Sequence, residues 1–240
     1  MSEEWVKLYS KMLENEEFQH LHQKSGWFDI SEVEDWEEYV LDVIKDKMKD
    51  NSRVFEVGCG CLAFLTVIKK NYKNITVGGI DGMKENEIFI KSNPLISENE
   101  YQNFHNGIVP NSLEKLIEDH KDYINNWDII LSNSMFQYLS SHEDAERTIR
   151  LMLKMSSDNG VIILSDIMDS DFEDETEPIL QNYWGQNYKK SLQKYLYFPQ
   201  DWWKRFTLDS NIDLEIKRVQ TEKYHRKRQR YCVYLMKKSN

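Results

Sequence analysis

Apolar side chains follow two alternating patterns along the chain. Short runs of aliphatic, β-branched and aromatic residues predict buried strands at 54–57, 77–81, 102–105, 129–131, 161–166, 214–219 and 231–236. Apolar residues at helical spacing predict helices at 5–13, 36–48, 62–72, 113–123 and 145–155, and a more polar helix at 85–91. Because strands and helices alternate, the pattern predicts an α/β fold with a mostly parallel sheet.

The 240 residues form one predicted domain with three parts. N-terminal helices occupy residues 1–50, and an α/β core occupies residues 51–240. An aromatic-rich insertion at about 170–210 interrupts this core before its last two strands. Those two strands are expected to pair as an antiparallel hairpin.

The first core strand runs into a glycine turn and then a helix. Gly58 and Gly60 interrupt the apolar pattern, which resumes at Leu62 with helical spacing. Such a turn lets a ligand approach the backbone at a helix N-terminus. Taken alone, the spacing also fits a dinucleotide-binding turn, G-x-G-x-x-G/A. Two acids argue against that reading: Glu56 lies inside the strand, and Asp81 ends the second strand, 21 residues after Gly60.

At this point the chain resembles the class I S-adenosylmethionine (SAM) dependent methyltransferases of the small-molecule type. Glu56, Gly58 and Gly60 match their E/D-x-G-x-G-x-G motif, although Leu62 replaces the third glycine. Trp127–Leu139 resembles the family's fourth motif, a buried strand followed by small polar residues and an aromatic turn. The resemblance implies a Rossmann-like, seven-stranded, mostly parallel sheet with an antiparallel last strand. Helices would cover both faces, and the N-terminal helices would form a lid.

The resemblance also implies which residues bind the cofactor, SAM, and its product S-adenosylhomocysteine (SAH). Asp81 would accept hydrogen bonds from the ribose hydroxyls, and Met83 would pack on the adenine. The expected set is Glu56, Gly58, Cys59, Gly60, Asp81, Gly82, Met83, Asn106, Gly107, Ile108, Asn133, Ser134 and Tyr138.

Aromatic residues of the lid and of the insertion are the main candidates for an organic-substrate pocket, because rigid amphipathic rings suit such a site. Two further residues follow the fourth strand and are expected to face the transferred methyl group. The expected substrate-binding set is Trp27, Phe28, Gln137, Tyr138, Tyr183, Trp184, Tyr188, Tyr197 and Trp202.

One charged segment precedes the last two predicted strands, and another lies between them. Six acids in the nine positions 169–177 predict a solvated loop. Five cations in residues 223–230 predict a hairpin tip or a site for an acidic group of the substrate.

If the methyl acceptor is a hydroxyl, a base must take its proton. The candidates are Tyr224, His225 and His22.

Composition excludes several classes of protein. A net charge of -10 argues against nucleic acid as a partner, because phosphate binding depends on Lys and Arg. Three cysteines without zinc spacing predict reduced thiols and no metal site. The sequence shows no signal peptide and no membrane-spanning run, so a soluble cytoplasmic protein is expected. Oligomeric state cannot be read from the sequence.

The leading hypothesis is a methyltransferase that uses SAM to methylate an oxygen or nitrogen of a small aromatic or amine-bearing metabolite. One alternative is a SAM-binding scaffold or regulatory protein without catalysis, and another is an RNA or protein methyltransferase. An NAD oxidoreductase is a more distant alternative, because the chain is short for an added substrate domain.

Overall fold

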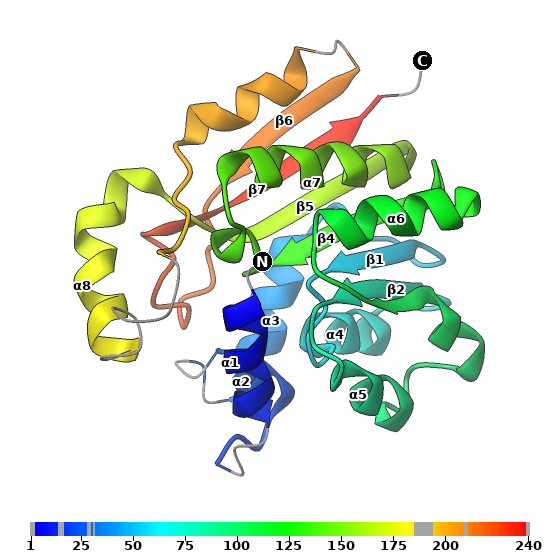
Figure 1. Ribbon diagram of the computed structural model, residues 1–240, viewed down its shortest axis with the longest axis horizontal. Coiled ribbons are helices and arrows are strands. Elements are labelled where there is room, and N and C mark those ends of the chain that lie inside the picture. The colour runs from blue at the N-terminus through cyan, green and yellow to red at the C-terminus, as the bar shows by residue number, and fades with distance from the viewer. Residues whose placement is uncertain are drawn as a thin grey trace.

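A computed structural model gives the fold and describes residues 3–13, 17–27, 30, 32–184, 194–208 and 211–238. Seven strands form one sheet in the order β3-β2-β1-β4-β5-β7-β6 (Figure 1). The parallel strands are β1 (Arg53–Val57), β2 (Thr76–Asp81), β3 (Phe104–Asn106), β4 (Trp127–Asn133) and β5 (Ser156–Met168). Antiparallel pairing adds β7 (Arg230–Lys237) and then β6 (Ile212–Lys217). The predicted fold class is confirmed.

Helices cover both faces of this sheet. On one side lie α3 (Val33–Ile44), α4 (Ala63–Asn71) and α5 (Asn86–Ser92), and on the other α6 (Asn111–Asp119), α7 (His142–Met155) and the 3-10 helix η5 (Gln200–Thr207). The remaining helical elements are α1 (Glu3–Leu13), α2 (Leu21–Lys24), α8 (Glu173–Trp184), η1 (Glu98–Asn103), η2 (Lys121–Tyr123), η3 (Phe136–Tyr138) and η4 (Ser170–Phe172).

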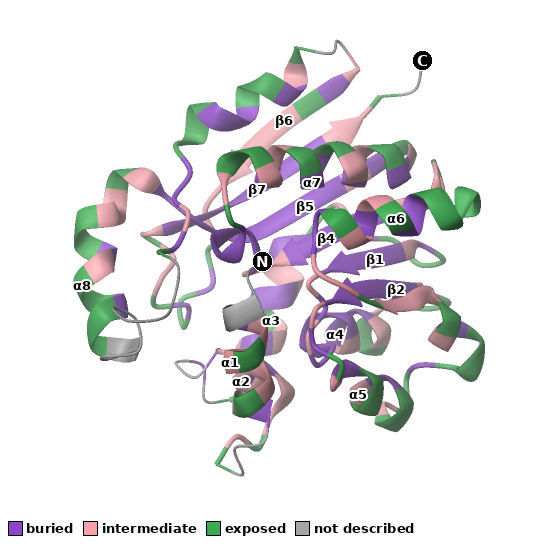
Figure 2. Cartoon of the chain, in the orientation of Figure 1, coloured by how far each residue is buried: buried purple, intermediate pink, exposed green. Residues whose placement is uncertain are grey.

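The period-two geometry of β1 divides its side chains between the two layers. Phe55 and Val57 pack in the core under α6 and α7, whereas Val54 packs in the core under α3 and α4. Glu56 therefore lies on the side of α3 and α4, where an apolar residue would be expected. In Figure 2 the central strands are buried almost throughout, and the exposed residues lie mainly on the helices and connecting loops.

The order of the strands defines where a ligand can bind. The chain runs from β1 outward through β2 to β3 and then crosses back to β4 on the other side of β1, so the strand order reverses at β1. Open α/β sheets bind ligands at the carboxyl ends of strands at such a reversal. In Figure 1, α1 and α2 lie at the edge toward which the arrowheads of β1, β2 and β4 point.

A β-bulge shapes the carboxyl end of β5. Leu164 pairs with Val233 and Ile167 pairs with Tyr231, so β5 advances three residues while β7 advances two. One extra residue is therefore inserted in β5. Asp166, inside this bulge, has a left-handed backbone with φ of 60°.

The acidic segment 169–177 is not the loop that its composition predicted. It forms η4 and the start of α8, where acids in the first turn interact favourably with the helix dipole. Asp169 is completely buried and accepts hydrogen bonds from the Arg218 guanidinium and the Gln200 amide. The prediction of a loop was therefore wrong, whereas Asp171, Asp174 and Glu175 are exposed to solvent as expected.

Among the residues that the structure describes, no helix is both long enough and apolar enough to cross a membrane.

Candidate functional site

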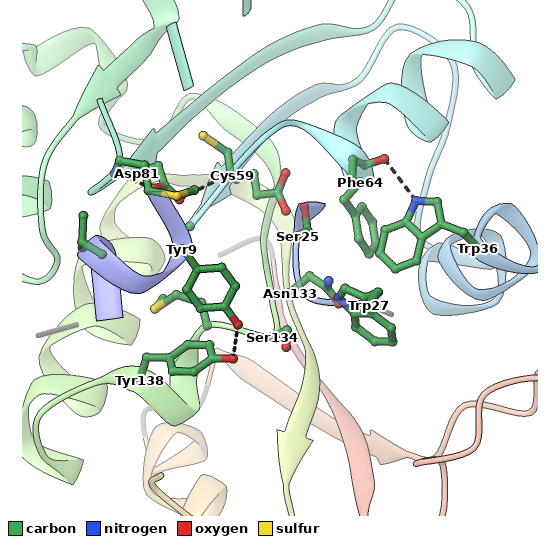
Figure 3. A pocket seen from close by; sticks show the side chains of 17 residues that line it. Tyr9, Ser25, Trp27, Trp36, Cys59, Phe64, Asp81, Asn133, Ser134 and Tyr138 are labelled. Carbon is green, nitrogen blue, oxygen red and sulfur yellow. Dashed lines mark hydrogen bonds between the residues drawn. The ribbon is translucent and has the colours of Figure 1, made fainter. Parts of the chain in front are cut away.

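Two adjoining cavities lie at the carboxyl ends of the central strands. The first has a volume of about 600 Å³, part of it open to solvent (Figure 3). Its lining comes from α1, from the segment after α2, from α3, from the turn after β1 and the start of α4, and from the ends of β1, β2 and β4. The lining residues are Val6, Tyr9, Ser25, Trp27, Trp36, Glu56, Gly58, Cys59, Gly60, Ala63, Phe64, Asp81, Met83, Asn133, Ser134, Met135 and Tyr138.

The turn after β1 leaves room at the floor of this cavity. Gly58 and Gly60 have φ of 83° and 48°, and a Cβ on Gly58 would lie 2.7 Å from Cγ of Met135. Leu62, at the third-glycine position, also has a left-handed backbone, with φ of 67°, and it caps α4. Its side chain is completely buried in the core, which offsets a backbone cost of about 1–2 kcal/mol. The turn thus keeps this conformation without its third glycine.

Asp81 is fixed at the end of β2 by two backbone hydrogen bonds. Its Oδ2 accepts from the amide of Gly60, and its Oδ1 accepts from the amide of Met83, both at 2.8 Å. Burial raises the pKa of this carboxyl, and the two amide bonds act in the opposite direction. The result is an oriented, buried carboxylate that lines the cavity.

Glu56 is the least satisfied polar group of the first cavity. Its side chain is buried, and its Oε2 has no hydrogen-bond partner among the described residues. Burial raises the pKa of Glu56 well above its ordinary value, and the nearby Asp81 raises it further. Because an unpaired buried carboxyl is costly, its position in a cavity wall indicates a ligand that donates hydrogen bonds or carries positive charge.

The end of β4 contributes a second oriented polar group. Oδ1 of Asn133 accepts from the Tyr39 hydroxyl at 3.0 Å and from Oγ of Ser165 at 2.7 Å. The amide nitrogen of Asn133 is therefore the atom left to serve a ligand. Ser134 follows with φ of 54° and donates its hydroxyl hydrogen to Asp166 at 2.6 Å.

Helix α1 covers the first cavity. The hydroxyls of Tyr9 and Tyr138 lie 2.5 Å apart, and the Ser10 hydroxyl donates to Glu85 at 2.9 Å. The buried Trp5 ring packs 4.7 Å from the ring of Tyr138. These contacts support the expected lid, and Figure 3 shows Tyr9 and Tyr138 meeting at the cavity wall.

The second cavity lies beyond this tyrosine pair and has a volume of about 1060 Å³, part of it open to solvent. Tyr9, Ser134 and Tyr138 line both cavities. The other lining residues come from the segment after α2, from η3 and α8, from the segment before η5, and from β7 and the segment before it. They are Gly26, Gln137, Thr176, Ile179, Leu180, Tyr195, His225, Arg226, Gln229 and Arg230.

Most of the predicted cofactor residues line the first cavity. The four that do not are Gly82, Gly107, Ile108 and Asn106. The first three border a smaller hollow that also contacts Gly58 and Asp81. The side-chain amide of Asn106 donates to the backbone carbonyl of Asp81 at 3.1 Å, so it holds the loop rather than facing the cavity.

The predicted substrate residues are divided. Trp27 lines the first cavity, Gln137 lines the second, and Tyr138 lines both. Tyr197 donates its hydroxyl to Glu177 at 3.0 Å, and Trp202 packs 5.2 Å from the ring of Phe198; neither lines a cavity. Phe28 and Tyr188, and the side chains of Tyr183 and Trp184, lie outside the described residues.

The three predicted proton acceptors have different environments. His22 is buried against Trp36, its Nε2 lies 2.8 Å from the carbonyl of Ile30, and it lines neither cavity. Tyr224 is buried and donates its hydroxyl to Asp166; burial raises its pKa well above the ordinary value, so it keeps its proton. This geometry contradicts a proton-accepting role for Tyr224. His225 is exposed at the rim of the second cavity.

Sequence reasoning missed Tyr9, Ser25, Asp166, Tyr195 and Arg230. Asp166 carried a local signal as the acid that closes a predicted strand, Arg230 as one of the five cations of residues 223–230, and Tyr195 as an aromatic residue of the insertion. The others reach the site through contacts between segments distant in sequence. In the part of the chain that the structure describes, no group of His, Cys, Asp and Glu side chains could hold a metal ion.

Comparison with known proteins finds this fold but no sequence relative. No protein-family profile matches the chain, and no curated protein matches it. Solved structures that share the fold include a SAM-dependent methyltransferase from Methanosarcina mazei, with a TM-score of 0.53 and 12% identity over 82% of this chain and 98% of that one. The CurJ carbon methyltransferase has a TM-score of 0.56 and 11% identity, covering 90% of this chain and 58% of that one.

A protein named for a different reaction also shares the fold. The [4+2]-cyclase SpnF has a TM-score of 0.56 and 10% identity, covering 85% of this chain and 81% of that one. At such identities the likeness establishes the fold, and the chemistry must be argued from the site.

Proposed function

We propose that this chain, which has the Rossmann-like fold of the class I SAM-dependent methyltransferases, binds SAM and transfers its methyl group to an oxygen or nitrogen of a small organic molecule. The observation that carries the proposal is the pair of buried carboxyls, Glu56 and Asp81, on either side of the glycine turn.

The first cavity suits SAM in its donors and acceptors. Asp81 would accept from the ribose hydroxyls, and Met83 would contact the adenine. Glu56 Oε2, which is buried without a partner among the described residues, would receive the amino group of the methionine portion. Asn133 has an amide nitrogen to offer its carboxylate. A Cβ on Gly60 would point toward Met83 and Ser25 at 3.7 and 3.8 Å, so glycine keeps this space open.

The bound cofactor supplies a methyl group on a positively charged sulfur. The acceptor's lone pair forms the new bond to the methyl carbon, the electrons of the broken bond remain on sulfur, and one acceptor proton is lost. The chain's part is to align the acceptor and exclude water. The covering helix α1 and the Tyr9–Tyr138 pair close the site. The ring of His225, at the rim of the second cavity, is the candidate proton acceptor.

Titration with SAH tests this proposal. We expect calorimetry to show binding in the micromolar range, and incubation with SAM and a metabolite panel to release SAH. Absence of SAH binding would refute the function. NADH serves as the comparison ligand, because a dinucleotide-binding protein would prefer it.

A SAM-binding protein without methyl transfer is the second candidate. SpnF, named as a cyclase, shows that the fold is not confined to methyltransferases. The described lining of the first cavity contains no histidine that could serve as a proton acceptor there. SAH binding without SAM turnover on any acceptor would favour this candidate.

Methylation of RNA is less consistent with the basic segment. Arg226 and Arg230 line the second cavity, Lys223 pairs with Asp35 at 3.2 Å, and Arg228 pairs with Glu175 at 3.2 Å. Four of the five cations of this segment are therefore divided between a cavity and local ion pairs.

The Tyr9→Phe variant tests the lid. It removes a hydrogen bond between α1 and η3, a contribution of about 0.5–1.5 kcal/mol. We expect SAH to dissociate about threefold to tenfold faster, as measured by stopped-flow tryptophan fluorescence, because Trp27 and Trp36 line the cavity. Tyr72→Phe, at the C-terminus of α4, is the control. An unchanged dissociation rate in Tyr9→Phe would show that α1 does not limit release.

A further inference from the structure

The second cavity is basic in a chain that is strongly acidic overall. The protein carries a net charge of -10, yet His225, Arg226 and Arg230 line this cavity. Among its described lining residues there is no Asp or Glu. Such a concentration of cations attracts an anionic ligand into a concave site.

Arg230 is the more unusual of the two arginines. Only 2% of its surface is exposed, and its Nε has no hydrogen-bond partner among the described residues. The nearest carboxylate contact joins Nε to Oδ1 of Asp166 at 3.7 Å, beyond hydrogen-bond range. Asp166 accepts instead from Tyr224 and Ser134. Another nitrogen of the guanidinium donates to the backbone carbonyl of Asp166 at 3.4 Å, and Nε remains an unpaired donor among the described residues on a side chain that lines the cavity.

Gln137 supplies an unused acceptor in the same wall. The hydroxyl hydrogen of Ser134 is committed to Asp166, so Oγ of Ser134 can only accept from Gln137. The atom of Gln137 that lies 2.9 Å from Oγ must then be its NH₂ group, and Oε1 points elsewhere. Gln137 is 2% exposed, and Oε1 has no partner within the described chain.

An unpaired donor and an unpaired acceptor, both on buried side chains, line one cavity. Leaving either atom unpaired costs about 1–3 kcal/mol, which a ligand with the opposite groups would recover. Ser134 lines both cavities and is the hydrogen-bond partner of Gln137. Tyr138, Tyr195, Ile179 and Leu180 provide an apolar and aromatic wall.

We propose that the second cavity binds an aromatic or similarly apolar methyl acceptor that carries a carboxylate. Arg230 and Arg226 hold the carboxylate, and Oε1 of Gln137 accepts a hydrogen from the nucleophilic amine or hydroxyl. A monoanion fits better than a phosphate dianion, because Asp166 already lies near the guanidinium. This inference rests on the proposed methyltransferase function and specifies its acceptor.

The roles assigned to these residues account for the bonds, electrons and proton of the methyl transfer. A lone pair on the acceptor nitrogen or oxygen forms the bond to the methyl carbon, and the sulfur keeps the electrons of the bond that breaks. The acceptor proton leaves to His225 or water. The carbonyl oxygen of Gln137 is too weak a base to take that proton, so Gln137 only orients the nucleophile.

Matched acids and amides test the proposal. Calorimetry with protein saturated with SAH would compare 3-hydroxybenzoate with 3-hydroxybenzamide, and 3-aminobenzoate with 3-aminobenzamide. We expect each acid to bind at least tenfold more tightly than its amide. Arg226→Gln and Arg230→Lys are expected to reduce the affinity for the acids about tenfold and to leave the affinity for the amides unchanged. Gln137→Met is expected to weaken both members of each pair.

The controls separate this inference from the proposed function. Arg228→Gln changes an exposed arginine of the same segment that lines neither cavity, and is expected to leave all affinities unchanged. SAH affinity is expected to be equal in every variant. Equal binding of acids and amides, no binding of any acid, or an acid preference that survives in both arginine variants would overturn the acceptor assignment. Failure of the wild type to bind SAH would overturn the methyltransferase function itself.

Discussion

The Asp81→Ala variant is expected to bind SAH about 100-fold more weakly than the wild type. In the structure both carboxylate oxygens are oriented by backbone amides of the surrounding turns. Alanine removes the proposed acceptor of the ribose hydroxyls and also releases the amides of Gly60 and Met83. Hydrogen bonds to a charged group contribute about 1.5–3 kcal/mol each, and a loss of about 2.7 kcal/mol corresponds to a factor of 100.

Two further variants sharpen the Asp81 test. Asp81→Asn keeps the shape but places an NH₂ group against a backbone N–H, so it is also expected to lose affinity. Asp158→Ala removes an exposed acid, 79% exposed in its ion pair with Lys237, and is expected to bind normally. Calorimetry gives the affinities, and thermal unfolding checks that each variant folds. Wild-type affinity in Asp81→Ala would mean that the ligand does not contact β2.

The Glu56→Gln variant is expected to stabilise the ligand-free protein while weakening SAH binding. Burial raises the pKa of Glu56 above its ordinary value of 4.5. Below that value the carboxyl is protonated in both the folded and the unfolded chain, and it has no effect on stability. As the pH rises above it, the unfolded chain ionises more readily, so the free energy of unfolding of the wild type falls.

Glutamine has no charge to lose or gain, so Glu56→Gln escapes this pH-dependent loss. Its unfolding temperature is therefore expected to exceed that of the wild type near neutral pH, and the difference is expected to shrink as the pH falls toward 4.5. The exposed Glu87→Gln variant is the control. A Glu56→Gln protein that is less stable than the wild type at neutral pH would contradict the assigned burial cost.

We expect SAH binding to favour the ionised form of Glu56, which is unfavourable in the ligand-free protein. The amino group of SAH would pair with the ionised carboxylate, so binding lowers the pKa of Glu56 and releases a proton. We expect SAH affinity to fall about tenfold in Glu56→Gln, by the loss of one charge-assisted hydrogen bond. Calorimetry in buffers with different ionisation enthalpies is expected to detect proton release in the wild type and less of it in the variant.

The sheet and the first cavity could be predicted from the sequence because their signals are local. The glycine turn and Asp81 come directly after apolar strands, and parallel strands bring their carboxyl ends to one edge. Leu62 departs from the motif, but its left-handed backbone is maintained by its buried side chain. A single position in a motif therefore says less about loop geometry than the surrounding packing does.

The second cavity could be predicted only in part, because its walls come from distant segments. Gln137, Tyr138 and His225 were expected at the site and line it. Tyr9 from α1, Tyr195 from the segment before η5 and Arg230 from β7 meet only after folding. The aromatic residues of the insertion also have two different roles, in the cavity wall and in the core, which composition cannot distinguish. Tyr195 lines the cavity, whereas Trp202 is part of η5 and packs in the core with residues of α7. The acidic composition of 169–177 likewise does not reveal that one acid, Asp169, is buried in an ion pair with Arg218.

Because of the bulge, the polar network around Asp166 depends on the number of residues in β5 as well as on their identity. Ser165 and Asp166 together oppose Cys232, and Asp166 holds Ser134 and Tyr224 from this irregular position. Deleting one codon here would restore a regular ladder and turn the following side chains to the opposite face. A whole acceptor site could thus be gained or lost through one insertion or deletion, with every functional side chain still encoded.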